Sequence, residues 1–160
     1  MSRYADSVGA STLAVIWSKA GDPRDYDSSG AFLKALGLNL KERSSGRRAG
    51  QLAITKRGPS AARRWIFFWS LRAVQRAELK PWYDAFIQVG RPASGAQEHR
   101  KMKGVVAIMR KLSRGLWAAM HRDEAFDYGQ LLEDKPPRKR RRRRKSRSKS
   151  PSGIGTTKPV

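Results

Sequence analysis

The chain is organised around a basic stretch at residues 36–59, LGLNLKERSSGRRAGQLAITKRGP. This stretch places two hydroxyls, Ser44 and Ser45, directly before Gly46. Six basic side chains surround them, namely Lys41, Arg43, Arg47, Arg48, Lys56 and Arg57. Glycines interrupt the stretch, so no long helix runs through it and backbone N–H groups are left for a ligand. Such a loop suits a phosphate, which it could hold or attack through serine. The alternative is a solvated basic loop whose serines only form turns.

The sequence blocks on both sides of this stretch form a recognisable series. GLNLKERSSG and GQLAITKRGP are preceded by VGASTLAVIWSKAGDPRDYDSSGAFLKALGLN. They are followed by ARRWIFFWSLRA, KPWYDAF and VVAIMRKLSRGLWAAMHRDEAFD. In order and spacing the blocks, which run from Ser7 to Tyr128, resemble the C-terminal transposase domain of the DEDD-type, bridge-RNA-guided insertion-sequence transposases.

The resemblance implies a reaction and a set of partners. It implies that a serine of this domain attacks a DNA phosphodiester and forms a covalent phosphoserine intermediate. It also implies a separate N-terminal RuvC-like domain with four metal-binding carboxylates, for which we expect no room in 160 residues. Mg²⁺ is therefore expected only together with that domain, and this chain is expected to hold no cofactor itself. DNA is the expected partner, with a guide RNA and a homo-oligomer in the full-length family, in the bacterial cytoplasm close to the nucleoid.

The candidate site residues follow from the basic stretch and from the resemblance. Ser45 is the first choice as nucleophile, because it adjoins Gly46, and Ser44 is the second. The expected phosphate cradle consists of Arg43, Arg47, Arg48, Lys56 and Arg57. Arg63 and Arg64 are further candidates for phosphate contact, because they lie near the start of the next helix. Gly9 matches the second glycine of the family's helix–hairpin–helix, whose backbone would face a phosphate, while the helix before it is expected to be absent.

The composition predicts a polyanionic partner. Lys and Arg number 35 against 13 Asp and Glu, which gives a net charge of +22 and a pI near 11.4. Nucleic acid is the first expectation and an anionic membrane surface the second. No stretch has the roughly 18 apolar residues needed to span a bilayer, and no secretory signal is evident. The chain has no cysteine for a disulfide or a thiolate zinc site. His99 and His121 are expected on different segments, which makes a metal site built from them improbable.

The apolar spacing predicts an all-α fold of about five helices. The expected helices cover residues 10–20, 29–36, 60–77, 81–89 and 104–121. In the helix that starts at Ser60, the spacing predicts buried side chains for Trp65, Ile66 and Trp69, although aromatics among arginines could also stack on bases. Residues 91–103 are expected to form a polar loop. The basic serine–glycine stretch, with residues 51–55, is the only expected extended piece.

The two ends of the chain differ from this helical part. Asp22, Asp25 and Asp27 are expected to serve in turns and caps rather than to bind a metal. The helical domain is expected to end at Asp134, and residues 135–160 form a tail with 12 Lys and Arg and no acidic residue. This tail is predicted to be disordered and to clamp phosphates without sequence preference. Two functions stay open: a strand-cleaving transposase fragment that is inactive without its RuvC-like domain, or a non-catalytic nucleic-acid-binding remnant.

Overall fold

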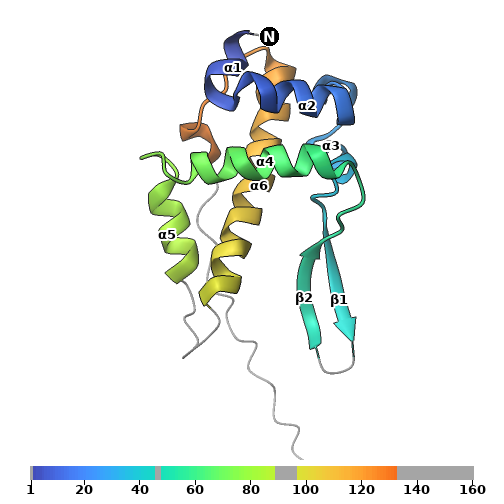
Figure 1. The fold of residues 1–160 in the computed structure, drawn as a ribbon, viewed down its shortest axis with the longest axis vertical. Coiled ribbons are helices and arrows are strands. Elements are labelled where there is room, and N and C mark those ends of the chain that lie inside the picture. The colour runs from blue at the N-terminus through green and yellow to red at the C-terminus, as the bar shows by residue number, and fades with distance from the viewer. Residues whose placement is uncertain (1, 46–47, 89–96, 133–160) are drawn as a thin grey trace, which may run out of the picture.

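A computed structural model describes residues 2–45, 48–88 and 97–132. Within these ranges the chain forms six α-helices, two short 3₁₀ turns and one two-stranded antiparallel hairpin (Figure 1), so the predicted all-α fold is confirmed. The elements in chain order are α1 (Ser2–Val8), α2 (Ala10–Ala20), η1 (Pro23–Asp25), α3 (Ser29–Ala35), β1 (Leu40–Ser45), β2 (Arg48–Ile54), α4 (Ser60–Ala73), α5 (Lys80–Gln88), α6 (Gln97–Arg122) and η2 (Gly129–Leu132). No helix in this part of the chain is both long and apolar enough to cross a membrane.

The core lies where α4 crosses α6, and the other helices pack around this crossing (Figure 1). Trp69 of α4 is fully buried, and its indole N–H donates to the Tyr128 hydroxyl over 2.9 Å. The Phe126 ring lies 5.2 Å from the Trp69 ring, so the segment after α6 closes over the core. The predicted burial of Ile66 and Trp69 is confirmed. Trp65 is only half-buried, because it lies at the edge of the apolar face.

Helix α6 begins earlier than the apolar spacing predicts. The expected loop at residues 91–103 is wrong for its last seven residues, because α6 already starts at Gln97. Residues 97–103, QEHRKMK, contain several strong helix formers and no Gly or Pro, so they extend the helix without an apolar stripe. Gly104 marks a close helix contact, since a Cβ there would lie 2.7 Å from the Tyr83 ring of α5. The placement of His99 and His121 on different segments is also wrong, because both lie on α6.

A helix precedes Gly9, contrary to the prediction. Helix α1 forms because Tyr4 and Val8, one turn apart, are both buried against the core. Gly9 separates α1 from α2 with a φ of 96°, a left-handed conformation that favours glycine. The chain therefore has a complete helix–glycine–helix unit at its start.

The serine stretch, expected as the one extended piece, is extended and forms a β-hairpin. Strands β1 and β2 pair from Leu40↔Ile54 through Arg43↔Gln51, and two residues, 46–47, connect them. Leu40, Leu52 and Ile54 fall on one face of the ribbon, since cross-strand partners and alternate residues share a face. The predicted tail at 135–160 lies outside the described residues.

Candidate nucleic-acid interface

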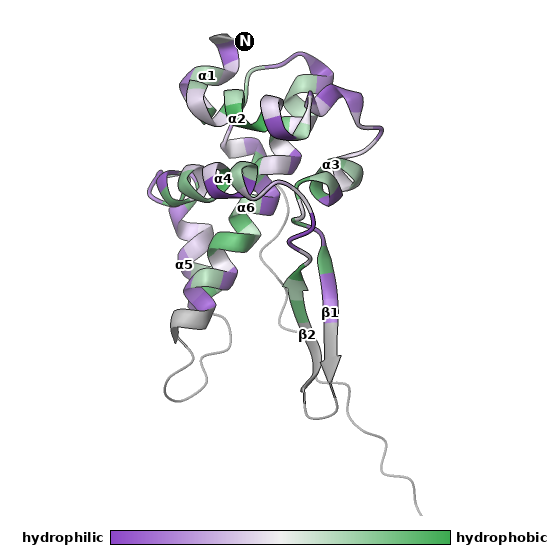
Figure 2. Cartoon of the chain, turned by 45° about the vertical axis from the view of Figure 1, so that its right-hand side comes forward, coloured by the Kyte–Doolittle hydropathy of each residue, from purple (hydrophilic) through white to green (hydrophobic). Residues whose placement is uncertain are grey.

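The hairpin β1–β2 is an arm that extends away from the helical body (Figure 1). In the part of the chain that the structure describes, its strands contact each other far more than they contact any helix. Leu52 is 60% exposed and Leu40 is 39% exposed, while Ile54 on the same face packs against the core, so the apolar face is open away from the root. Figure 2 shows hydrophilic and hydrophobic residues following one another where β1 leaves the body. A two-stranded ribbon of this kind has the width that the major groove of DNA admits.

The two candidate serines lie at the far end of the arm. Strand β1 ends at Ser45, whose Cα pairs with that of Arg48 at the start of β2. The register shifts by one residue between Arg43 and Ser45, so that Ser44 faces two residues of β2 instead of one. Such a bulge redirects the local side chains and is common beside active sites. Gly46 and Arg47 lie outside the described residues, as do the side chains of residues 43–51.

The root of the arm, residues 37–39 and 55–58, joins it to the helical body. Close backbone packing fixes this root. Lys56 N donates to Gly37 O and Thr55 N donates to Asn39 O, each over 3.0 Å. The Thr55 hydroxyl also donates to the Asn39 side chain. Gly58, with a φ of 140°, lies so close to α3 that a Cβ there would overlap the carbonyl oxygen of Ala35. The two legs of the hairpin therefore leave the body along one defined path.

The predicted cations at the root have different surroundings. Lys56 and Arg57 are exposed, and Lys56 has a left-handed backbone with a φ of 57°. The Arg63 guanidinium donates to Gly58 O over 2.7 Å and to Leu36 O over 3.3 Å, so it holds the two legs together. Arg64 is exposed on α4, next to the half-buried Trp65.

The arm separates the root cations from the serines. From Leu40 to Ser45 the strand advances by about 17 Å, at about 3.4 Å per residue. The structure thus brings Arg43 and Arg48 close to the serines in the backbone, while Lys56, Arg57 and Arg63 lie at the other end of the arm. Contacts to one DNA molecule from both ends would involve different phosphates.

A second basic site, at Gly9, involves two arginines that the sequence analysis does not select. A cavity of about 220 Å³ lies beside Gly9 and is lined by Arg72 of α4, Arg76 of the turn after α4, Asp6 and Tyr128. Arg72 donates to Val8 O over 3.3 Å, and the Arg76 guanidinium lies 4.4 Å from the centre of the Tyr128 ring. The expected helix at 60–77 would hold both arginines, but α4 ends at Ala73 and Arg76 lies in the turn that follows, so the end of that prediction is wrong. The fold brings both residues to Gly9.

Asp22, one of the three clustered aspartates, serves in a turn. No group of three or more metal-ligating side chains occurs in the described part of the chain. Asp22 accepts hydrogen bonds from the Nε–H and Nη2–H groups of Arg24 and caps η1 by accepting from Arg24 N, as expected for a turn residue. The hydrogen bond to Arg24 lowers the Asp22 pKa to about 2, so this carboxylate is already paired.

Comparison with protein families places the chain beside the transposases. The model of the transposase IS116/IS110/IS902 family matches residues 5–88, which is 84 of the 160 residues. The matched segment runs from α1 to α5 and includes the whole β1–β2 arm. No curated protein and no solved structure matches the chain.

Proposed function

The chain belongs to the IS116/IS110/IS902 family of transposases and so has a role in transposition, and on this premise we propose that its arm presents Ser45 to a DNA phosphodiester as a nucleophile. The observation that carries the proposal is the register shift at the end of a free-standing arm, between Arg43 and Ser45. The backbone of Ser44 and Ser45 lies next to Arg43 and Arg48 at the end of the arm away from the root, which supports contact of the serines with a DNA strand.

DNA binding follows from the distribution of charge around this arm. The net charge of +22 favours any nucleic acid through release of condensed counterions. Lys56 and Arg57 are exposed at the root, and the glycine junction between α1 and α2 lies beside Arg72. Such contacts to phosphates fix the position of a duplex but do not read its sequence.

The proposed step exchanges one ester for another. The Ser45 hydroxyl loses its proton and forms a bond to phosphorus, while one P–O bond of the DNA strand breaks. The released sugar hydroxyl takes up a proton, and the strand stays linked to the protein as a phosphoserine ester. Arg43, Arg47 and Arg48 would stabilise the charge that develops on the phosphoryl oxygens.

Further groups are required to complete this reaction. A serine hydroxyl needs a base, and the attacking and leaving oxygens both need charge stabilisation. The family resemblance assigns these tasks to a RuvC-like domain with four carboxylates. We therefore expect the 160-residue chain by itself to bind DNA without cleaving it. The guide RNA and the homo-oligomer stay predictions.

The test is to trap the covalent adduct when a RuvC-like domain of the family is supplied in trans with Mg²⁺. Labelled DNA should stay attached to the protein under denaturing conditions for the unmodified chain and for Ser44→Ala, but not for Ser45→Ala. Ser18→Ala, which removes a surface serine of α2, serves as the matched control and should form the adduct. DNA affinity should be the same in all four proteins.

Two results would count against this assignment. An adduct that persists in Ser45→Ala and disappears in Ser44→Ala would make Ser44 the nucleophile. DNA binding without an adduct in any of the proteins, under conditions where an intact family member forms one, would favour the non-catalytic nucleic-acid-binding function.

A further inference from the structure

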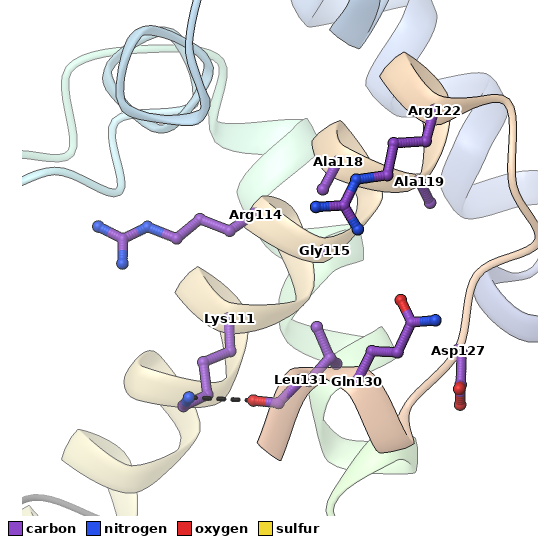
Figure 3. Close-up of a pocket in the computed structure, with 9 residues that line it drawn as sticks. All are labelled: Lys111, Arg114, Gly115, Ala118, Ala119, Arg122, Asp127, Gln130 and Leu131. Atoms are coloured by element: carbon purple, nitrogen blue, oxygen red, sulfur yellow. Dashed lines mark hydrogen bonds between the residues drawn. The ribbon is translucent and has the colours of Figure 1, made fainter. Parts of the chain in front are cut away.

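Helix α6 and the 3₁₀ turn η2 enclose a basic groove outside the segment that matches the family (Figure 3). The groove has a volume of about 470 Å³ and contains three cationic side chains and one carboxylate. Its lining consists of Lys111, Arg114, Gly115, Ala118, Ala119, Arg122, Asp127, Gln130 and Leu131. In Figure 3 the side chains of Arg122 and Gln130 project into the space between the two elements, while Arg114 extends outward from α6.

The groove has a fixed wall and a floor of small residues. Lys111 Nζ donates to Leu131 O over 3.1 Å, which ties η2 to α6. Gly115 allows this approach, since a Cβ there would overlap the Leu131 side chain. Asp127, the one carboxylate in the lining, accepts a hydrogen bond from Gly129 N over 2.8 Å and so starts η2. These contacts hold η2 against α6 and so fix the shape of the groove.

The outer face of α6 continues this basic surface. Between Arg100 and Arg122 the helix has no acidic residue. Three cations lie along this face: Arg110 follows Lys103 by seven residues, and Arg114 follows Arg110 by four. Because a helix turns by about 100° per residue, they fall within a sector of roughly 40° around the axis. They span about 16 Å along the helix axis. None of the three has an ion-pair partner in the part of the chain that the structure describes.

Among the described residues, no acidic side chain pairs with Arg110 or Arg114. Arg110 is half-buried, and its Nε has no hydrogen-bond partner among the described residues. Burial lowers the pKa of Arg110, and the neighbouring Arg114 charge lowers it further. Both effects mean that the guanidinium is in an unfavourable environment for a positive charge. An anion placed between the two arginines would offset both.

We infer that this face of α6, together with the η2 groove, is a second surface that binds the sugar–phosphate backbone of duplex DNA. The inference rests on the proposed function for its partner, DNA, but concerns a different surface. In Figure 1 the arm descends on one side of α6 and η2 lies on the other. The three cations span about 16 Å. Along the duplex axis, about five successive phosphates of one strand span the same length, at about 3.4 Å each. The groove volume lies in the range of about 300–1,000 Å³ that accommodates small ligands, so it admits a phosphate with its sugar.

The first test measures duplex binding by the full chain as a function of salt. Arg110→Gln combined with Arg114→Gln should reduce the slope of log affinity against log salt by about 1.8, or about 0.9 per phosphate contact. The matched control combines Lys19→Gln with Lys101→Gln, two exposed lysines away from this face, and removes the same charge. Lys101 lies on α6 itself, roughly 160° around the axis from Lys103. The control should leave the slope within a few tenths of the unmodified value.

The second test uses the absence of cysteine from the chain. Ala118→Cys places a single thiol in the groove, and a photoreactive label on it should cross-link to duplex DNA. The same label on Lys101→Cys should give little cross-link. A parallel arm variant, Lys56→Gln combined with Arg57→Gln, reports on the proposed function separately.

The outcomes separate the two proposals. If the arm variant weakens binding while the α6 variant and its control behave alike, and Ala118→Cys does not cross-link, the α6 surface is wrong and the arm stands. If the unmodified chain does not bind duplex DNA, the proposed function fails as well. Loss of binding to structured RNA alone in the α6 variant, with duplex DNA unaffected, would also overturn the inference and assign the surface to RNA.

Discussion

Substitution of Gly58 by alanine tests whether the arm is fixed at its root. Gly58 has a φ of 140°, and a Cβ would overlap the Ala35 carbonyl oxygen and lie 3.0 Å from Gly37 N. The backbone conformation costs a non-glycine residue about 1–3 kcal/mol. Displacing the packed backbone costs about another 1–3 kcal/mol. The smaller entropy of the unfolded alanine chain returns only about 0.4–1 kcal/mol. The net loss of stability should be about 3 kcal/mol.

The measurement combines thermal unfolding with amide hydrogen exchange. A loss of about 3 kcal/mol lowers the Tm by about 12 °C, at roughly 4 °C per kcal/mol for a domain of this size. If the strain stays local, the amides of Thr55 and Lys56, which bond to the opposite leg, should lose protection instead. Gly30→Ala is the control, because Gly30 lies in helix α3. A Cβ at this position would meet only Ser28 Oγ, at 3.7 Å. It should stabilise by about 0.5–1 kcal/mol. Unchanged Tm and unchanged protection in Gly58→Ala would refute the argument that the root is rigid.

Two further predictions concern the helical body. Trp69→Ala should reduce the free energy of unfolding by about 3–5 kcal/mol in denaturant titrations, because it empties the core and leaves the Tyr128 hydroxyl without its donor. A cooperatively folded variant with an unchanged midpoint that has lost only DNA binding would instead support base stacking. Asp22→Ala should cost about 1 kcal/mol at pH 7 through loss of the cap and of the Arg24 pair. Since the Asp22 pKa is lowered from 3.8 to about 2, this difference should be complete above pH 4 and disappear as the pH falls from 4 to 2. A difference that is constant over this range would contradict the assigned pairing.

The helices could be predicted where an apolar stripe and a cap coincide. Ser28 accepts from Ala31 N at the start of α3, and Gly21 follows the last residue of α2, as their sequence positions suggest. The hairpin could not be predicted in the same way, because KERSS has low strand propensity and no alternation of apolar residues. Its pairing depends on bonds at the root, such as Lys56 N to Gly37 O, between residues 19 positions apart.

The candidate site was predictable in its chemistry but not in its layout. A serine pair among arginines is visible in the sequence, whereas its place at the end of an arm is not. Arg63 illustrates the limit, because a basic residue near a helix start suggests a phosphate contact, yet its guanidinium donates to two backbone carbonyls. The cavity beside Gly9 and the groove beside η2 each combine residues more than 10 positions apart, and only tertiary packing places them together.

We expect the arm to be less stable than the helical body. This difference bears on which of them provides DNA affinity and which positions the serine. An isolated two-stranded ribbon is marginally stable in water, and among the described side chains of this arm Ile54, near the root, packs against the core. The α6 surface and the Gly9 junction, by contrast, rest on a core centred on α4 and α6 and keep their shape without a ligand. Preformed cations lose little conformational entropy when they meet phosphates, whereas ordering a marginally stable ribbon has an entropic cost. Affinity for DNA should therefore come mainly from the body, and positioning of the serine from the arm, so that changes at the tip and changes on α6 should alter reaction and binding independently.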